Sequence, residues 1–107
     1  ERIVVIVPTT GMSGGACYAP QAALAESARI LVKSAARQWG ASGITVNAVA
    51  VEPHWFSIDS NISGPVAIAP RSLSNEVSPV GVVTWLCSEA ARDVTGQTIV
   101  CDGGLWM

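Results

Sequence analysis

The sequence predicts an α/β fold whose parallel sheet follows the order strand, helix, strand, helix, strand. Residues 3–7 are an unbroken run of β-branched apolar side chains, which is typical of a strand buried on both faces of a parallel sheet. Residues 44–51 form a second run that is nearly all apolar, and residues 98–101 form a shorter third run. Helical patterns separate the three runs, which favours a right-handed βαβαβ unit.

The first apolar run is followed by a segment that we expect to be a loop. Pro8 comes directly after the run, and residues 9–16 contain glycine at positions 11, 14 and 15. Glycine clusters between periodic segments are typical of turns and loops.

A long helix is predicted from Pro20 to Trp39. Its charged side chains fall in a stripe only ~80° wide on a helical projection, and they are Glu26, Arg29, Lys33 and Arg37. Pro20 suits the first turn of a helix, and Gly40 suits its end. One face of a sheet cannot cover so much apolar circumference, so we expect a second packing partner for this helix.

The second half of the chain predicts a long loop, a helix and a short strand. Residues 52–77 have no clear period and contain three prolines, and loops of this length are usually functional or mobile. Ser78 and Pro79 are a suitable N-cap and first helical residue, and the helix should extend to about residue 91. Thr95 and Gly96 predict a turn before the last strand.

The composition restricts the functional classes. Only 13% of the 107 residues are charged and 50% are hydrophobic, whereas soluble domains average about 25% charged. No apolar run approaches the roughly 18 residues of a membrane span, and a net charge of −2 without a basic cluster disfavours nucleic acid as a partner.

Three widely spaced cysteines predict free thiols in a reducing cytoplasm and no metal site. A chain that opens directly on an apolar strand favours a fragment, or a subunit whose sheet another segment completes.

Four motifs occur in an order that resembles the C-terminal half of a short-chain dehydrogenase/reductase. They are Tyr-Ala-Pro-Gln-Ala at residues 18–22, Gly-Ile-Thr-Val-Asn-Ala-Val at 43–49, Thr-Gly-Gln at 95–97 and Asp-Gly-Gly at 102–104. The resemblance covers nearly the whole chain. It implies a single domain at residues 1–107 that is part of a longer Rossmann-like domain, with NAD or NADP as the cofactor.

The resemblance places Tyr18 at the position of the family's general acid or base, but the neighbouring chemistry is altered. The family motif is Tyr-x-x-x-Lys, and the lysine position here is Ala22. Free tyrosine titrates at about 10, and a nearby cation favours the phenolate, so this loss matters. The family's catalytic serine aligns with Pro8, which leaves Thr9 as the candidate hydroxyl. The alternative for Tyr18 is a packing role.

The positions that pass beside the nicotinamide in the family align with Val51 and Glu52. They are therefore candidate cofactor-binding residues, together with His54 in the following loop. A bulky carboxylate at Glu52 is unfavourable for close approach of a cofactor, and His54 has the alternative of an ordinary surface histidine. The chain contains no Gly-rich phosphate-binding turn, so we do not expect it to bind a dinucleotide alone.

Three functional hypotheses remain open. The first is a short-chain dehydrogenase/reductase homologue with a degenerate active site, acting as the non-catalytic subunit or segment of an NAD(P)-dependent oxidoreductase. The second is an active alcohol/ketone oxidoreductase in which Tyr18 works with residues outside this chain, and the third is a non-redox interaction scaffold. Ala22 argues against the related halohydrin dehalogenases, which keep Ser-Tyr-Arg. A homo- or hetero-oligomer is expected through the helix from Pro20 to Trp39 and the apolar tail at residues 105–107.

Overall fold

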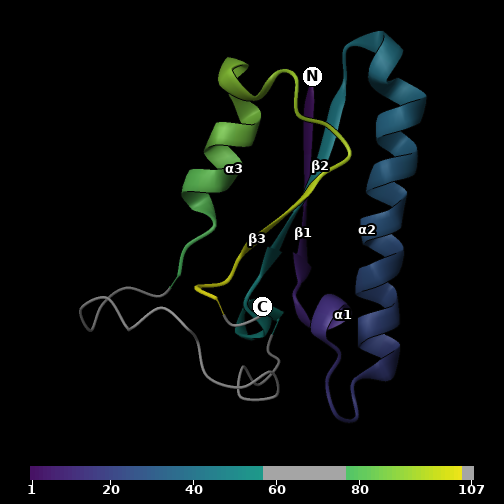
Figure 1. Ribbon diagram of the computed structural model, residues 1–107, viewed down its shortest axis with the longest axis vertical. Helices are drawn as coiled ribbons and strands as arrows, with labels where there is room; N and C mark the ends of the chain where they lie inside the picture. The colour runs from purple at the N-terminus through teal and green to yellow at the C-terminus, as the bar shows by residue number, and fades with distance from the viewer. Residues whose placement is uncertain (57–76, 105–107) are drawn as a thin grey trace.

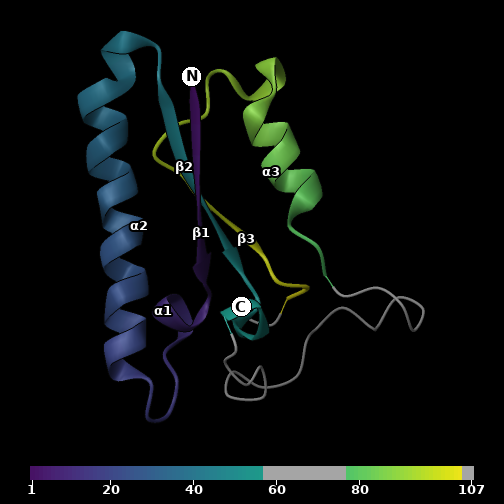
Figure 2. The same cartoon turned by 180° about the vertical axis from the view of Figure 1, so that it is seen from behind.

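The structure is a computed structural model that describes residues 1–56 and 77–104. Three parallel strands form one sheet in the order β1-β2-β3, and helices α2 and α3 cover opposite faces of it (Figure 1, Figure 2). This arrangement confirms the predicted α/β class and parallel sheet. The main elements in chain order are β1 (Arg2–Pro8), α1 (Thr10–Ser13), α2 (Ala19–Trp39), β2 (Thr45–Val51), α3 (Val80–Cys87) and β3 (Thr98–Cys101).

The core of the molecule is organised around β2, whose seven residues are all buried. Successive side chains on a strand point to opposite faces, so β2 contributes to two separate apolar clusters. Val46, Ala48 and Ala50 pack with α2 on one face. Val49 and Val51 pack with Leu86 of α3 on the other. The predicted second strand at residues 44–51 is confirmed as β2, and it is buried on both faces.

The prediction that residues 3–7 form a strand is confirmed by β1, but within the described residues this strand is not buried on both faces as expected. Only Val7 is buried in this strand, and the side chains of Ile3 and Ile6 are 37% and 39% exposed. The reason is topological, because β1 pairs with β2 on one side and has no neighbouring strand on its other side among the described residues. Within the described residues, the apolar strand that the sequence predicts as interior lies at the edge of the sheet.

Helix α2 begins at Ala19, one residue before the predicted start, and ends at Trp39 as predicted, but it buries only a narrow face. Ala25, Val32 and Ala36 are its only buried residues, whereas Leu24 and Leu31 are 71% and 64% exposed. The sheet alone therefore leaves large apolar side chains of α2 uncovered, as the narrow charged stripe predicted.

The segment at residues 9–16 is not wholly a loop, because residues Thr10–Ser13 form the short helix α1. The carbonyl of Thr9 accepts hydrogen bonds from the N–H groups of Met12 and Ser13, at 2.9 and 3.0 Å. Helix α1 packs against the start of α2 through Gly11. A Cβ atom at Gly11 would lie 2.8 Å from Cβ of Ala25 and 3.3 Å from the carbonyl oxygen of Ala22. Glycine at this position permits the close approach of the two helices. In the sequence alone, the same glycine indicates a loop.

The turn before β3 is attached to β2 by side chains from the motifs noted in the sequence. The amide of Asn47, which is 1% exposed, donates from Nδ2 to the carbonyl of Val94 at 2.8 Å and accepts from the N–H of Gln97 at 3.0 Å. Oγ1 of Thr95 accepts from the N–H of Val46 at 3.0 Å. These residues hold the third strand in register and have a structural role.

The last helix is shorter than predicted. Helix α3 ends at Cys87, and Ser88 is extended, so residues Glu89–Ala91 form a separate 3₁₀ turn. The Ser88 hydroxyl donates to the carbonyl of Trp85 at 2.7 Å, which provides a local alternative to continuing the helix. Most of the predicted long loop, at residues 57–76, and the tail at 105–107 lie outside the described residues.

We predict that Gly11→Ala destabilises the fold by about 1–3 kcal/mol, because the added methyl group overpacks the contact between α1 and α2. Gly81→Ala is the matched control, since a Cβ atom at this position in α3 would meet no atom within 4 Å apart from its chain neighbours and the backbone of its own helix. That change should be neutral or stabilise the chain by up to about 1 kcal/mol. Urea unfolding followed by circular dichroism measures both, and equal midpoints for the two variants would contradict the close contact.

Candidate active site

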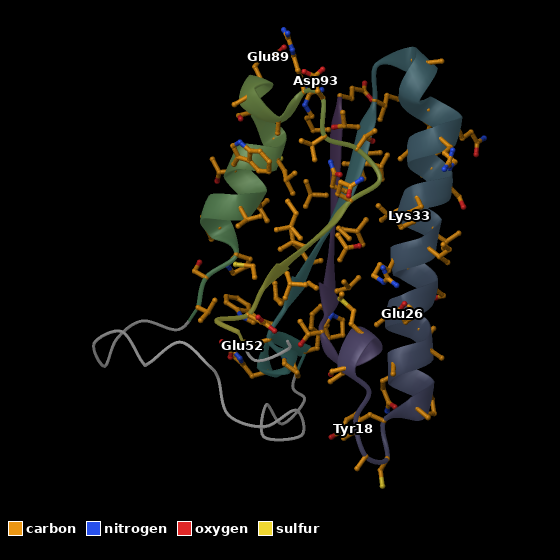
Figure 3. All side chains as sticks on the ribbon, viewed as in Figure 1. Tyr18, Glu26, Lys33, Glu52, Glu89 and Asp93 are labelled. Carbon is orange, nitrogen blue, oxygen red and sulfur yellow. The ribbon has the colours of Figure 1, made fainter. Side chains whose placement is uncertain are left out.

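The candidate site lies where the parallel strands end. Ligands of open α/β folds bind beyond the carboxyl ends of the strands. At this end of the sheet β1 finishes at Pro8 and β2 at Val51, and α1 and the start of α2 lie beside them (Figure 1). Tyr18 and Glu52 are both found toward this end, whereas Lys33 lies about halfway along α2 (Figure 3).

Tyr18 is the N-cap residue of α2 and is half-buried. Its carbonyl accepts from the N–H of Ala22 at 2.8 Å, so the helix starts at the predicted motif. Tyr18 lines a groove of about 510 Å³ between β1 and α2, together with Pro8, Gln21 and Phe56. This volume lies within the range typical of small-molecule sites.

Thr9, the candidate replacement for the family's serine, is fully buried and does not line this groove. Its N–H donates to the carbonyl of Val51 at 3.0 Å, which joins the ends of β1 and β2. Its Oγ1 is buried and has no hydrogen-bond partner. The residue that faces the groove is the preceding one, Pro8, whose side chain has no hydroxyl.

Two cations of α2, Arg29 and Lys33, do not line this groove and have hydrogen-bond partners elsewhere. Arg29 binds the Glu26 carboxylate through three contacts of 2.7–3.0 Å, and this hydrogen bonding raises the pKa of Arg29, partly opposed by desolvation. Lys33 donates to the carbonyl of Gly96 at 3.2 Å. Neither side chain substitutes for the lysine that the family places at residue 22.

The three proposed cofactor-contacting residues have different surroundings. Val51 is fully buried, and its carbonyl is bonded to Thr9. Glu52 has a 13% exposed side chain and pairs with His54, with 2.9 Å between Oε2 and Nδ1. The His54 ring also lies against Trp55, at 5.6 Å between centroids. The structure thus brings Glu52 and His54 together but leaves Val51 no exposed side chain.

Cys101 is a neighbour of Glu52 that the sequence reasoning did not connect with the site. Burial raises the pKa of the Cys101 thiol, and the carboxylates of Asp102 and Glu52 raise it further. Strand register was the missing signal, because Val51 and Cys101 are partners across β2 and β3. The thiol is therefore held in its protonated form, and all three cysteines are free, as predicted.

The Asp-Gly-Gly motif forms a turn, as its sequence predicts. Oδ1 of Asp102 accepts from the N–H of Gly104 at 3.0 Å, and Gly103 and Gly104 have φ angles of 67° and 81°, which favour glycine.

Two further classes of feature are absent from the part of the chain that the structure describes. In residues 1–56 and 77–104, no group of three or more His, Cys, Asp or Glu side chains is arranged to hold a metal ion. Within the same ranges, no helix combines the length and apolarity needed to span a bilayer.

Comparison with known proteins connects this geometry to a family. The family described as Enoyl-(Acyl carrier protein) reductase matches residues 2–106. An A-factor type gamma-butyrolactone 1'-reductase of Streptomyces virginiae is 33% identical over 111 residues, which cover 92% of this chain and 43% of that protein.

Solved structures give the same result. The 4-hydroxyisoleucine dehydrogenase complexed with NADH and succinate is 25% identical with a TM-score of 0.74, covering 98% of this chain and 44% of that one. A dehalogenation enzyme is 25% identical with a TM-score of 0.78, covering 99% and 48%. This chain therefore spans less than half the length of each of these three proteins. Sequence motifs, parallel topology and relatives agree that the chain belongs to the short-chain dehydrogenase/reductase family.

Proposed function

We propose that this chain is a segment or subunit of an NAD(P)-dependent oxidoreductase and that its own active site is degenerate. The surroundings of Tyr18 carry the proposal. The tyrosine lines a groove at the end of the sheet, but Pro8 lines that groove where the family has a serine. Ala22 stands one turn after Tyr18 where the family has a lysine.

The physical argument concerns the proton that a general acid or base must exchange. A phenol whose free pKa is about 10 is mostly protonated at neutral pH and transfers its proton poorly without a nearby cation. Two positively charged side chains of α2 are engaged away from the groove of Tyr18. Arg29 pairs with Glu26, and Lys33 donates to the carbonyl of Gly96. The Glu52 carboxylate, found toward the same end of the sheet, is paired with His54.

The residues present do not fit a dinucleotide by themselves. Ala22 has no group that could hydrogen-bond a ribose, and Val51 exposes no side-chain surface. Glu52 brings a carboxylate to the position where the family's backbone passes close to the nicotinamide, and it is paired with His54. We therefore assign NAD or NADP to the completed assembly and derive no reaction step from this chain alone.

One alternative is favoured by a specific observation. Tyr18 is half-buried and faces a groove of suitable volume together with Gln21 and Phe56. An active oxidoreductase in which residues from another polypeptide supply the cation would use the same groove. A non-redox scaffold would instead use the groove for packing alone.

The isolated chain should not bind a dinucleotide, because it lacks a phosphate-binding turn and Ala22 cannot reach a ribose. Titration calorimetry with NADH and with NADPH is expected to show no binding at sub-millimolar concentrations. The 4-hydroxyisoleucine dehydrogenase, whose solved structure contains NADH, is the positive control for NADH under the same conditions. A micromolar dissociation constant for either nucleotide would show that this chain carries a cofactor site of its own.

Tyr18→Phe tests the degenerate site within the assembly that contains this chain. Turnover is followed as oxidation of NADH or NADPH with a panel of small ketones. We expect turnover to change by no more than about threefold, because no transition-state interaction is lost. Gln21→Ala, which alters the same groove without touching the phenol, is the control. A loss on the order of 10²-fold for Tyr18→Phe alone would identify a working general acid and support the active alternative.

A further inference from the structure

Two cations on α2 have no carboxylate partner. The other arginines that the structure describes contact the carboxylates of Glu26 or Glu89. Lys33 instead donates to the carbonyl of Gly96 at 3.2 Å, and Arg37 has no hydrogen-bond or ion-pair partner within residues 1–56 and 77–104. The two cations are one turn apart on the helix, where like charges repel each other. An anion held between them would remove this repulsion.

Lys33 and Arg37 line one pocket on the side of α2 that faces the turn before β3. The pocket has a volume of about 190 Å³, and its other lining residues are Ala36 and residues 95–97. The chain between α3 and β3 approaches α2 in this region (Figure 1, Figure 2). Among the described residues, no acidic side chain lines the pocket, and its volume is below the roughly 300–1,000 Å³ of sites for drug-sized ligands. It therefore suits a small anionic group.

The pocket is built on backbone that β2 holds in place. The N–H of Gly96 donates to the carbonyl of Val46 at 2.8 Å, and Oγ1 of Thr95 accepts from the N–H of Val46 at 3.0 Å. Gly96 has a φ of 72°, and a Cβ atom there would lie 3.5 Å from Cβ of Ala36. Small residues at both positions let the turn lie close to the helix. The cations of α2 and the polar groups of the turn are thus brought to one pocket by the fold itself.

The polar groups that line the pocket are mainly hydrogen-bond donors. The Arg37 guanidinium carries five N–H donors and the Lys33 ammonium carries three, of which one is used by the bond to the turn. The Thr95 hydroxyl already accepts a bond from β2, and no described residue accepts its hydrogen. The Gln97 amide donates to the carbonyl of Thr95 at 3.2 Å and has a second N–H. Two positive charges beside neutral donors are complementary to an oxyanion with several acceptor oxygens.

We propose that this pocket binds a phosphate group, as inorganic phosphate or as the end of a phosphomonoester, and that the bound group ties α2 to the turn before β3. A phosphate group carries a charge of about −1.5 to −2 at pH 7 and presents three strong acceptor oxygens. This charge matches the two cations, and the oxygens match the donors of the helix and the turn. A carboxylate carries a single charge and would leave one of the two cations uncompensated.

The proposed phosphate site is remote from the candidate active site. At ~1.5 Å per residue, Tyr18 and Arg37 are separated by roughly 28 Å along α2, and Lys33 lies about halfway along the helix (Figure 3). The pocket shares no lining residue with the groove of Tyr18. This inference is therefore independent of the proposed function, since it uses neither the phenol nor a nicotinamide cofactor.

Helix polarity offers another explanation for one of the two cations. Arg37 lies in the last turn of α2, where the helix dipole favours a positive charge. This effect falls off within one turn, so it does not explain Lys33, and it requires no donors from residues 95–97. On this explanation Arg37→Gln would destabilise the chain equally with and without phosphate, whereas a phosphate site makes the effect depend on phosphate.

Phosphate titration of the full chain at constant ionic strength, followed by the amide NMR signals of residues 95–97, tests the site. We expect saturable shifts with a dissociation constant of about 1–10 mM, because exposed charges interact weakly in water. Arg37→Gln and Lys33→Gln should each weaken binding roughly tenfold, since each removes a charge-assisted hydrogen bond. Arg29→Gln is the matched control, because it removes the same charge from the same helix outside the pocket, and it should bind like the parent. Circular dichroism checks that all variants fold.

Other ligands separate the sources of the phosphate group. Glycerol 1-phosphate that binds as tightly as phosphate, or more tightly, assigns the site to a phosphomonoester, and weaker binding assigns it to the free ion. Acetate should bind about tenfold more weakly than phosphate. Phosphate should raise the thermal unfolding midpoint of the parent and of Arg29→Gln but not that of Arg37→Gln. No saturable binding by the folded chain, acetate binding as tight as phosphate binding, or equal losses in Arg29→Gln and Arg37→Gln would overturn the proposal.

Discussion

The burial of β2 is the constraint on which the rest of the structure depends. All seven of its residues are removed from solvent, so both faces and both edges of this strand must be covered. Helix α2 and helix α3 cover the faces, and β1 and β3 cover the edges. A buried polar group without a partner is costly, and Asn47 is tolerated because its amide bonds both Val94 and Gln97. The turn before β3 is therefore held by the same strand that forms the core.

The parts of the fold that sequence reasoning predicted are those in which local pattern and tertiary environment agree. Strand β2 and helix α2 have long apolar or periodic patterns, and both were predicted nearly to the residue. Helix α1 was missed because Gly11 signals a turn locally, while its actual role is to admit Ala25 at close range. The exposure of β1 could not be predicted, since strand composition does not reveal whether a neighbour is present.

At the candidate site, the residue that begins α2 follows the family pattern, whereas the residues around it that would supply the chemistry do not. Tyr18 was placed correctly at the start of α2 because helix-start signals are local, and Ala22 follows it one turn later. Thr9 could not be judged from sequence, because whether a hydroxyl faces a groove or the interior depends on how the strand end turns. The pairing of Glu52 with His54 joins residues close in the chain. The proximity of Cys101 depends on strand register across β2 and β3, which sequence pattern alone does not specify.

The chain has few charged residues, and its described structure leaves several large apolar side chains exposed. The most exposed large apolar residues include Leu24, Ile30 and Leu31 of α2 and Val80 of α3, at 59–71% exposure. Burying one leucine contributes about 1.5–3 kcal/mol, while association costs an estimated 4–15 kcal/mol. Leu24 and Leu31 together supply about 3–6 kcal/mol on burial, which lies near the lower end of the association cost. A polypeptide surface that covers this face of α2 in a stable contact must therefore bury more apolar area than these two leucines provide.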